Sequence, residues 1–294
     1  MPSAERKEQD KLRKSVITDY DKLHTLMNIV LTSSRIQSIT FPDKRVFRGN
    51  LHAMIFGSIG VGKSTDLYAM ARHENKTPTY SITKAHLFGS VDKNTGLPIL
   101  PMTWFNRRSI IAIDDFYYDR SKHDTMASLL SMMEFPNIEK NIGYRCNDID
   151  ERDDGLFIRI KNNKISLNTC FSVIMTTMFN PLKLQNNFMK ALASRCVLIP
   201  FYPSKEMIYK QLKGEQTYKP KYIRKVKQNM KISNTNYNRI VQFCKDKDVD
   251  TSLIKRVSGD LSRILCITNK WDEPFFEFVL NLNNAFRVDD DDVK

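Results

Sequence analysis

The sequence predicts an α/β fold: a three-layer domain with a parallel β-sheet, followed by a small C-terminal helical lid. Two observations lead to this prediction. From about residue 46 to 205, short apolar runs alternate with segments of helical periodicity, a pattern typical of parallel strands joined by helices. The chain also has 294 residues, of which 41% are apolar. This is enough for one large domain or two smaller ones with a sizeable buried core.

Four buried strands and two helices are expected in the α/β part, 46–205. The strands are the apolar runs 51–56, 109–115, 170–177 and 195–201, and the helices are 63–73 and 123–134. Before this part, residues 1–45 are expected to form a charged helix and a short extended piece.

The alternation of strands and helices is interrupted between about residues 137 and 170. Period-2 stretches flank the turn-forming Asn162-Asn163 here, which predicts one or two hairpins inserted before the third strand. After Pro203 the chain is expected to be helical and basic, with a helical lid over 206–287. The acidic tail, 288–294, is expected to be unstructured.

Composition limits the partners and the compartment. The 46 lysines and arginines exceed the 33 acidic residues and give a formal charge of +13, which favours a nucleic-acid partner. The five cysteines form no CxxC pair, so a disulfide framework or zinc site is not expected, and a cytoplasmic location fits better. The charged N-terminus lacks the apolar core of a signal peptide, and no apolar run is long enough to span a membrane.

A glycine-rich loop of the pattern Gly-x-x-x-x-Gly-Lys-Ser follows the first strand and precedes a helix. Its glycines allow successive backbone N–H groups to point at phosphate oxygens. Lys63 is then placed to reach the β- and γ-phosphates, and the Ser64 hydroxyl to reach Mg²⁺. The helix also turns its positive dipole end toward the anion. The expected nucleotide-binding residues are Gly57, Ser58, Gly60, Val61, Gly62, Lys63, Ser64 and Thr65.

The second strand ends in two carboxylates, as the far wall of a magnesium–nucleotide site requires. Asp114 is expected to hold Mg²⁺ through its water shell, and Asp115 to orient and polarise the attacking water as a general base. The third strand is followed by neutral polar residues. Either Thr177 or Asn180 is expected to contact the γ-phosphate or the water, and both alternatives stay open.

Two arginines further along the chain are candidates for charge stabilisation. Arg195 lies between a short helix and the fourth strand. In a ring of subunits it can project into the neighbour's nucleotide site and neutralise charge in the transition state. Arg263 lies on a helix that begins at Gly259-Asp260, and it is expected to contact the γ-phosphate from the helical lid.

In this order, the glycine loop, the Asp-Asp strand, the Thr/Asn strand end and the two arginines resemble an AAA+ ATPase. The segment "ALASRCVLIPF" resembles the arginine-finger segment of MCM helicases, and "GSVDKNTGLPILPMTWFNRRSIIAIDDF" is similar to their stretch before the acidic strand. The Asp-Asp pair and the spacing from Asn180 to Arg195 are more similar to the superfamily 3 helicases of viruses and plasmids. The resemblance covers 46–205 and, more loosely, 206–287. It implies ATP and Mg²⁺ as cofactors and a homo-oligomeric ring, a hexamer.

Both helicase groups carry a hairpin between the acidic strand and the Thr/Asn strand. A basic residue at its tip reaches DNA in the central channel of the ring. In this chain the resemblance places that tip either at Lys140 or at the "KNNK" turn with Lys161 and Lys164. It therefore implies that these lysines contact a DNA backbone, most simply that of a single strand.

The resemblance implies, first, a DNA motor in the replication of a virus, plasmid or other mobile element, working with a replication partner protein. Two alternatives stay open. One is an ATP-dependent initiator or helicase-loader switch with slow turnover. The other is a protein-remodelling or packaging ATPase, for which Tyr144 in "NIGYRC" is a candidate pore residue.

Overall fold

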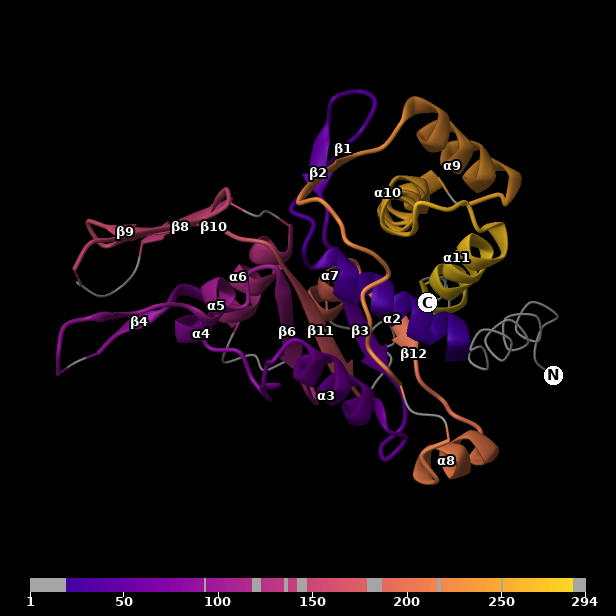
Figure 1. Cartoon of the computed structure of the whole chain (residues 1–294), viewed down its shortest axis with the longest axis horizontal. Coiled ribbons are helices and arrows are strands. Elements are labelled where there is room, and N and C mark those ends of the chain that lie inside the picture. The colour runs from indigo at the N-terminus through magenta and orange to yellow at the C-terminus, as the bar shows by residue number, and fades with distance from the viewer. Residues whose placement is uncertain are drawn as a thin grey trace.

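A parallel sheet of four strands lies at the centre of the molecule, in the order β12-β3-β11-β6 (Figure 1). The computed structural model describes residues 20–92, 94–117, 123–134, 137–141, 147–178, 187–215, 218–249 and 251–287. The strands are β3 (His52–Phe56), β6 (Ser109–Ile113), β11 (Phe171–Thr177) and β12 (Cys196–Pro200). Every residue in them is buried, as expected for parallel strands covered on both faces. The prediction of a parallel α/β sheet is confirmed.

Strand β11 separates the strand before the glycine loop from the strand before the acidic pair. It pairs with β3 on one side, through Thr176 and Ile55, and with β6 on the other. A parallel bridge between Thr79 and Ile113 extends the sheet beyond β6. The second strand is shorter than predicted, because the chain bends at Asp115, whose φ is 49°.

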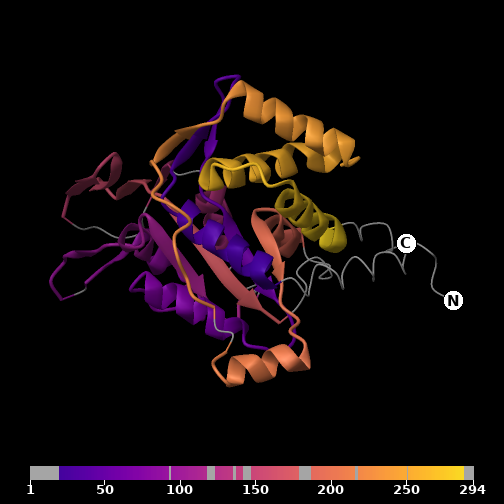
Figure 2. The same cartoon turned by 45° about the vertical axis from the view of Figure 1, so that its right-hand side comes forward.

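Helices cover both faces of the sheet and make three layers. Helices α2 (Tyr20–Ser33) and α3 (Lys63–His73) lie side by side on one face (Figure 2). Helix α3 lies in the connection from β3 to β6. Helix α6 (His123–Glu134) lies in the connection from β6 to β11, and α7 (Asn187–Ala193) in the one from β11 to β12. These last two connections cross the sheet in the opposite direction to the first. Because parallel crossovers are right-handed, α6 and α7 lie on the other face.

The predicted insertion forms an antiparallel sheet in the order β7-β10-β9-β8. Its strands are β7 (Asn137–Asn141), β8 (Ile149–Asp153), β9 (Leu156–Lys161) and β10 (Lys164–Asn168). One face is buried through Leu156, Ile158 and Ile160, which alternate with more exposed residues. Both figures show this sheet extending from the body of the molecule beside a second hairpin. That hairpin, β4 (Ser90–Val91) and β5 (Pro98–Ile99), lies between α4 (Lys84–Phe88) and α5 (Met102–Phe105).

A three-stranded sheet joins the segment after α2 to residues 229–231, far along the chain. Strand β1 (Ser38–Thr40) pairs with β2 (Val46–Arg48) and, in parallel, with β13 (Asn229–Lys231). The sequence indicated residue 45 as the end of an N-terminal segment, but β1 before this residue pairs with β2 after it. Helix α2 packs against β3 and β11. The segment from α2 to β2 is therefore built into the α/β domain.

The basic stretch after α8 (Lys205–Leu212) is not helical, contrary to the prediction for the chain after Pro203. Residues 218–228 run along α2, where the N–H groups of Lys221 and Ile223 donate to the Asn28 and Thr32 side chains. Pro220 lacks an N–H group, which also disfavours a helix interior. Side chains of α2 therefore take the place of helical hydrogen bonds.

Three helices form the C-terminal part. They are α9 (Asn234–Asp246), α10 (Thr251–Thr268) and α11 (Glu273–Arg287). Ile240 of α9, Leu261 of α10 and Phe276 of α11 are completely buried, so apolar faces hold this bundle together. The acidic tail, 288–294, lies outside the described residues.

Candidate functional site

The glycine loop lies at the carboxyl edge of the sheet, between β3 and α3, as predicted. Gly60 and Gly62 have φ angles of 77° and 96°, which L side chains rarely adopt. Gly57 is required for space, because a Cβ atom there would lie 2.1 Å from the carbonyl oxygen of Phe201. The backbone of the loop therefore depends on these three glycines.

Lys63, the first residue of α3, points into the loop. Its Nζ donates hydrogen bonds to the carbonyl oxygens of Gly57, at 2.9 Å, and Ser58, at 2.6 Å. Burial lowers the pKa of Lys63, and the carboxylates of Asp115 and Asp114 oppose this shift. A partly desolvated ammonium bonded only to loop carbonyls can exchange these bonds for stronger, charge-assisted bonds to phosphate oxygens.

Asp114 lies beside Ser64, although the two residues come from different elements. The Ser64 hydroxyl donates to Oδ1 of Asp114 at 2.8 Å. The Thr176 hydroxyl, from the intervening strand β11, donates to the same oxygen at 2.6 Å. A carboxylate and a hydroxyl are oxygen ligands of the kind that Mg²⁺ prefers, directly or through its waters. Ser64 and Asp114 therefore fit the predicted magnesium site.

Asp115 is exposed at the same edge of the sheet, next to buried Asp114. Its N–H donates to the Thr176 hydroxyl at 2.8 Å. Its left-handed φ of 49° is one that Asp and Asn adopt more readily than most residues. The Thr176 hydroxyl therefore holds the Asp114 carboxylate directly and holds Asp115 through the backbone N–H of that residue.

The other loop and sensor residues are described only in part. Ser58 and Thr65 are exposed and Val61 is partly buried. Thr177, the last residue of β11, is buried and points to the opposite face of the sheet from Thr176. Asn180 lies outside the described residues, so the choice between Thr177 and Asn180 stays a prediction.

Arg195 lies at the opposite edge of the sheet from the glycine loop. It precedes the amino end of β12, whereas the loop follows the carboxyl end of β3, which is parallel to β12. Its guanidinium donates to Oε2 of Glu134 at 2.6 Å and to the carbonyl oxygen of Ala191 at 2.8 Å. The structure thus does not bring Arg195 together with the loop of its own chain.

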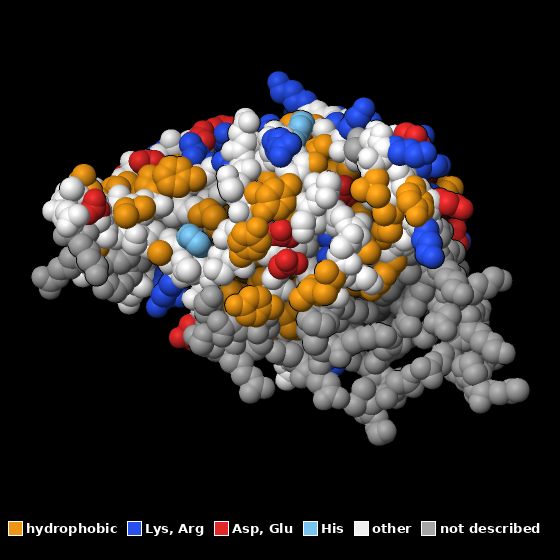
Figure 3. Space-filling view, turned by 90° about the horizontal axis from the view of Figure 1, so that it is seen from below, with side chains coloured by type: hydrophobic (Ala, Val, Ile, Leu, Met, Phe, Trp, Pro, Cys, Tyr) orange, Lys and Arg blue, Asp and Glu red, His pale blue; other side chains and the backbone are white. Residues whose placement is uncertain are grey.

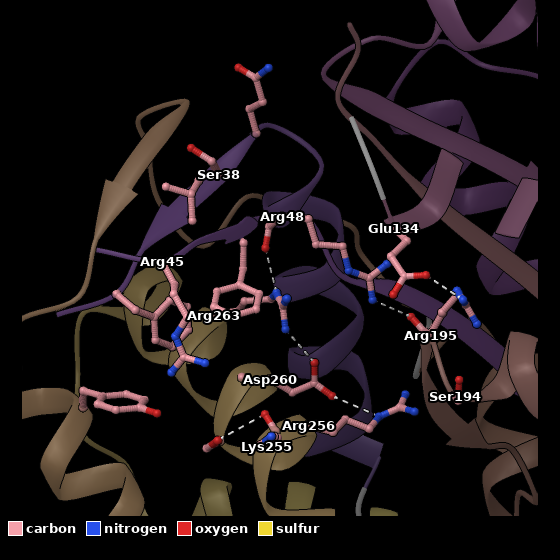
Figure 4. A pocket seen from close by; sticks show the side chains of 17 residues that line it. Ser38, Arg45, Arg48, Glu134, Ser194, Arg195, Lys255, Arg256, Asp260 and Arg263 are labelled. Carbon is pink, nitrogen blue, oxygen red and sulfur yellow. Dashed lines mark hydrogen bonds and ion pairs between the residues drawn. The ribbon is translucent and has the colours of Figure 1, made fainter. Parts of the chain in front are cut away.

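Arg263 also lies far from the loop. Arg48, Arg195, Arg256 and Arg263, with Glu134 and Asp260, line a cavity of about 750 Å³, here called the arginine pocket (Figure 4). Arg263 donates to Asp260 at 3.1 Å and to the carbonyl oxygen of Arg48 at 3.0 Å. The expected contact between Arg263 and the phosphates is therefore not made within one chain.

The arginine pocket carries excess positive charge. Its lining holds two carboxylates, those of Glu134 and Asp260, against six cationic side chains: Arg45, Arg48, Arg195, Lys255, Arg256 and Arg263. Burial, together with the neighbouring charge of Arg263, lowers the pKa of Arg48 to about 9. Arg48 donates to the carbonyl oxygens of Met133 and Arg195 and so joins α6 to the start of β12. A cavity of this charge can bind a multivalent anion.

The "KNNK" stretch forms the tight turn between β9 and β10. Asn162 and Asn163 have φ angles of 51° and 59°, as a type I′ turn requires, and Lys161 and Lys164 face each other across it. Lys140, the alternative tip, lies within β7 opposite Ile165. Its Nζ donates to the Ser128 hydroxyl at 2.7 Å and lies over the Phe88 ring. The Lys140 side chain is thus held against α6 and α4. Residues 142–146, which follow β7, lie outside the described residues, so the choice of the tip stays a prediction.

Exposed apolar side chains surround the glycine loop. One follows each strand of the main sheet and the Thr79 bridge: Ile59, Tyr80, Tyr117, Met178 and Tyr202. We call this set the apolar rim. Ile59 is 79% exposed. Figure 3 views the molecule from this side and shows apolar side chains gathered around acidic ones.

Several charged or polar residues of these two sites were not identified from the sequence. They include Arg45, Arg48, Glu134, Thr176, Lys255 and Arg256. One signal was present, because Arg256, Asp260 and Arg263 share one face of a helix. The other positions depend on which strands are neighbours, and that is not visible in a single sequence.

No protein-family model matches this chain, and no curated protein shows significant sequence similarity to it. Among the helices that the structure describes, none combines the length and apolar character needed to cross a bilayer. Function is therefore inferred from the geometry of the two sites.

Proposed function

We propose that the protein is an ATP-hydrolysing, ring-forming DNA motor of the AAA+ type, with α9 to α11 as its helical lid. One observation carries this proposal. The glycine loop and the arginine pocket lie at opposite edges of the same sheet. Each is half of a phosphate-binding site, and the halves can meet only when two copies of the chain associate.

The loop half supplies the binding and hydrolytic groups. Lys63 would exchange its loop carbonyls for the β- and γ-phosphates of ATP, and Ser64 and Asp114 would hold Mg²⁺. Bound there, Mg²⁺ would bridge phosphate oxygens and neutralise the charge that develops on them. Asp115 would orient the attacking water, with Thr177 or Asn180 beside it.

The arginine half would come from the neighbouring copy. Arg195 would contact the γ-phosphate, and Arg263 would support the pocket from α10. Two different surfaces meet in such a contact, which generates a closed ring when the rotation between copies closes. Burial of the apolar rim would stabilise the contact. A hexamer is the expected ring.

The DNA contact would be made by the "KNNK" turn. Lys161 and Lys164 flank this turn at one end of a sheet that extends from the body (Figure 1). The net charge of +13 favours a polyanion, and a lysine pair that contacts only the backbone suits single-stranded DNA of any sequence. We propose a role in the cytoplasmic DNA replication of a virus or mobile element, with a replication partner protein.

Mixing two inactive variants tests the composite site. Lys63→Ala removes the loop lysine and Arg195→Ala removes the arginine, so each variant alone should hydrolyse ATP poorly. In a random mixture, about a quarter of the contacts would pair an intact loop with an intact arginine. We expect the mixture to regain ATPase activity above either variant alone. A mixture as inactive as its components would contradict a site shared between copies.

Strand displacement tests the motor itself. We expect the wild-type protein to unwind a forked DNA duplex with ATP and to form a hexamer with a non-hydrolysable ATP analogue and single-stranded DNA. ATP-gated DNA binding without unwinding or translocation would instead favour the initiator or loader switch. ATP hydrolysis with no DNA binding would favour the protein-remodelling alternative, whose candidate residue Tyr144 lies outside the described residues.

A further inference from the structure

Arg195 is held by a specific partner on its own chain. The Arg195 guanidinium donates to Oε2 of Glu134 at 2.6 Å, as the dashed line in Figure 4 marks. Its Nε atom is buried and makes no hydrogen bond. The side chain is thus restrained by Glu134 and keeps one donor unused.

Glu134 lies at a junction between the nucleotide strand and the inserted sheet. It is the last residue of α6, which follows β6 and the two aspartates. Strand β7, which pairs with β10, begins three positions later, at Asn137. Lys140 of β7 is bonded back to Ser128 of α6. A shift at the end of α6 therefore displaces the sheet that carries the "KNNK" turn.

The junction combines a fixed contact with an exchangeable one. Met133, next to Glu134, accepts hydrogen bonds at its carbonyl oxygen from buried Arg48 and from His52. These backbone contacts are inaccessible to solvent. The side chains of Glu134 and Arg195 are 47% and 24% exposed, and ion pairs of this exposure are weak. A phosphate group entering the arginine pocket can therefore compete with Glu134 for Arg195.

We infer that the ion pair between Glu134 and Arg195, here called the latch, couples the arginine pocket to the "KNNK" turn. This inference rests on the proposed function, because it needs a neighbouring nucleotide to reach Arg195. Without that nucleotide, Glu134 retains Arg195 and fixes the end of α6. When Arg195 pairs with the phosphate, Glu134 is released, and the start of β7 is free to move. ATP bound to one copy thus changes the inserted sheet of the next copy.

Amide hydrogen exchange of the inserted sheet tests the latch. Peptides that cover 137–141 and 156–168 are followed with and without a non-hydrolysable ATP analogue. In the wild type, we expect the analogue to increase exchange in both peptides. In Glu134→Gln, which keeps the side-chain size but loses the charge, exchange is expected to be high already and the analogue to add little. Glu134→Asp, whose carboxylate is one methylene further from Arg195, is expected to behave like Glu134→Gln.

Glu139→Gln is the matched control. Glu139 is exposed on β7, and its one hydrogen bond within the described part of the chain is from the Ser166 hydroxyl, at 3.3 Å. It should keep the wild-type response. ATPase activity gives a second readout, in which Glu134→Gln loses stimulation by single-stranded DNA while Glu139→Gln keeps it.

Two results overturn the latch. One is an unchanged response to the analogue in Glu134→Gln, and the other is a wild type that binds the analogue with no change in either peptide. Equilibrium binding of the labelled analogue is measured on the same samples. A wild type that binds no nucleotide contradicts the proposed function itself, and this result is recognised in the binding measurement before exchange is considered.

Discussion

The hydroxyl of Thr176 donates to Asp114 at 2.6 Å and accepts from the N–H of Asp115 at 2.8 Å. One side chain of the intervening strand β11 thus holds both acidic residues at the end of β6. The acidic pair is therefore positioned by a residue that is distant in sequence and adjacent in the sheet.

Thr176→Val removes the hydroxyl and keeps the shape of the side chain. We expect it to destabilise the protein by about 1 to 3 kcal/mol, because Asp115 loses a hydrogen-bond partner at its N–H group. The ATPase rate should fall as well, since Asp114 keeps only its hydrogen bond from Ser64 and the backbone of Asp115 is no longer held by Thr176. Urea unfolding and steady-state ATPase assays measure the two effects. A normal rate in a folded Thr176→Val protein would contradict the positioning role.

Asp115→Asn separates catalysis from folding. Asparagine also adopts a left-handed φ readily, so the free energy of unfolding should stay within about 0.5 kcal/mol of the wild type. ATP binding should persist, while hydrolysis should fall by at least about 100-fold through loss of the general base. Asp115→Ala should additionally cost about 1 kcal/mol because alanine is strained at this φ. Hydrolysis by Asp115→Asn at the wild-type rate would assign the base elsewhere.

Arg263→Ala and Arg195→Ala should differ in stability. Arg263 is buried against Asp260. Its removal leaves the buried Asp260 carboxylate with only the more distant Arg256, at 3.9 Å, and should cost about 3 kcal/mol. Arg195→Ala removes a partly exposed ion pair with Glu134 and a hydrogen bond to the Ala191 carbonyl oxygen, and should cost about 1 kcal/mol. Urea denaturation of the two variants checks this difference. Equal stability would mean that Arg263 has no structural role in the pocket.

His52 should make stability depend on pH. Burial, aided by the charge of Arg48, lowers the pKa of His52 well below its ordinary value of 6.5. The ring is neutral, with Nδ1 accepting from the N–H of Val173 and Nε2 donating to Met133. Below pH 6.5 the unfolded chain binds a proton at this residue that the folded chain does not. The contribution of His52 to the free energy of unfolding is therefore complete above pH 6.5. Below pH 6.5 that free energy falls by about 1.4 kcal/mol per pH unit.

Urea unfolding between pH 5 and pH 8 measures this slope. His52→Gln keeps a donor and an acceptor without a titrating ring. The variant should be less stable at pH 8, and its stability should fall less steeply with acidification than that of the wild type. Identical slopes would show that His52 titrates normally in the folded protein.

The lysines of the inserted sheet should differ in their effect on DNA. The double variant Lys161→Ala/Lys164→Ala should bind single-stranded DNA more weakly. The slope of log K against log [salt] should become shallower by about 0.7 for each phosphate that is no longer neutralised. Lys140→Ala is the control, because its ammonium is bonded to Ser128. Fluorescence anisotropy at several salt concentrations measures both effects. A larger loss of affinity for Lys140→Ala than for the double variant would contradict the placement of the DNA contact at the turn.

The sequence was sufficient to predict the strands of the main sheet, because fully buried parallel strands are continuous apolar runs. It also predicted the turn at Asn162-Asn163, since few residues adopt two successive left-handed conformations. The neighbours of each strand were not predictable, because pairing depends on contacts between distant segments. For that reason the link from Thr176 to Asp114 and the pairing of β1 with β13 emerged only in the structure.

The arginines show the same limit. Arg195 was identified from its place before a strand, but Glu134 as its partner was not, because nothing local connects these two residues. The basic stretch 218–231 suggested a helix, yet Asn28 and Thr32 supply partners for its N–H groups. A tertiary contact thus replaced local helical hydrogen bonding.

Strand β12 joins the arginine pocket to the glycine loop of the same chain. Arg195 precedes its amino end, and Phe201, whose carbonyl oxygen leaves no room for a Cβ atom on Gly57, follows its carboxyl end. The strand is about 17 Å long at the usual rise per residue. A short extended strand within a sheet is stiff, so its two ends move together. In the proposed ring, a displacement of Arg195 would therefore be transmitted along β12 to the glycine loop of the same subunit, so that successive nucleotide sites would be coupled without any contact to the proposed DNA.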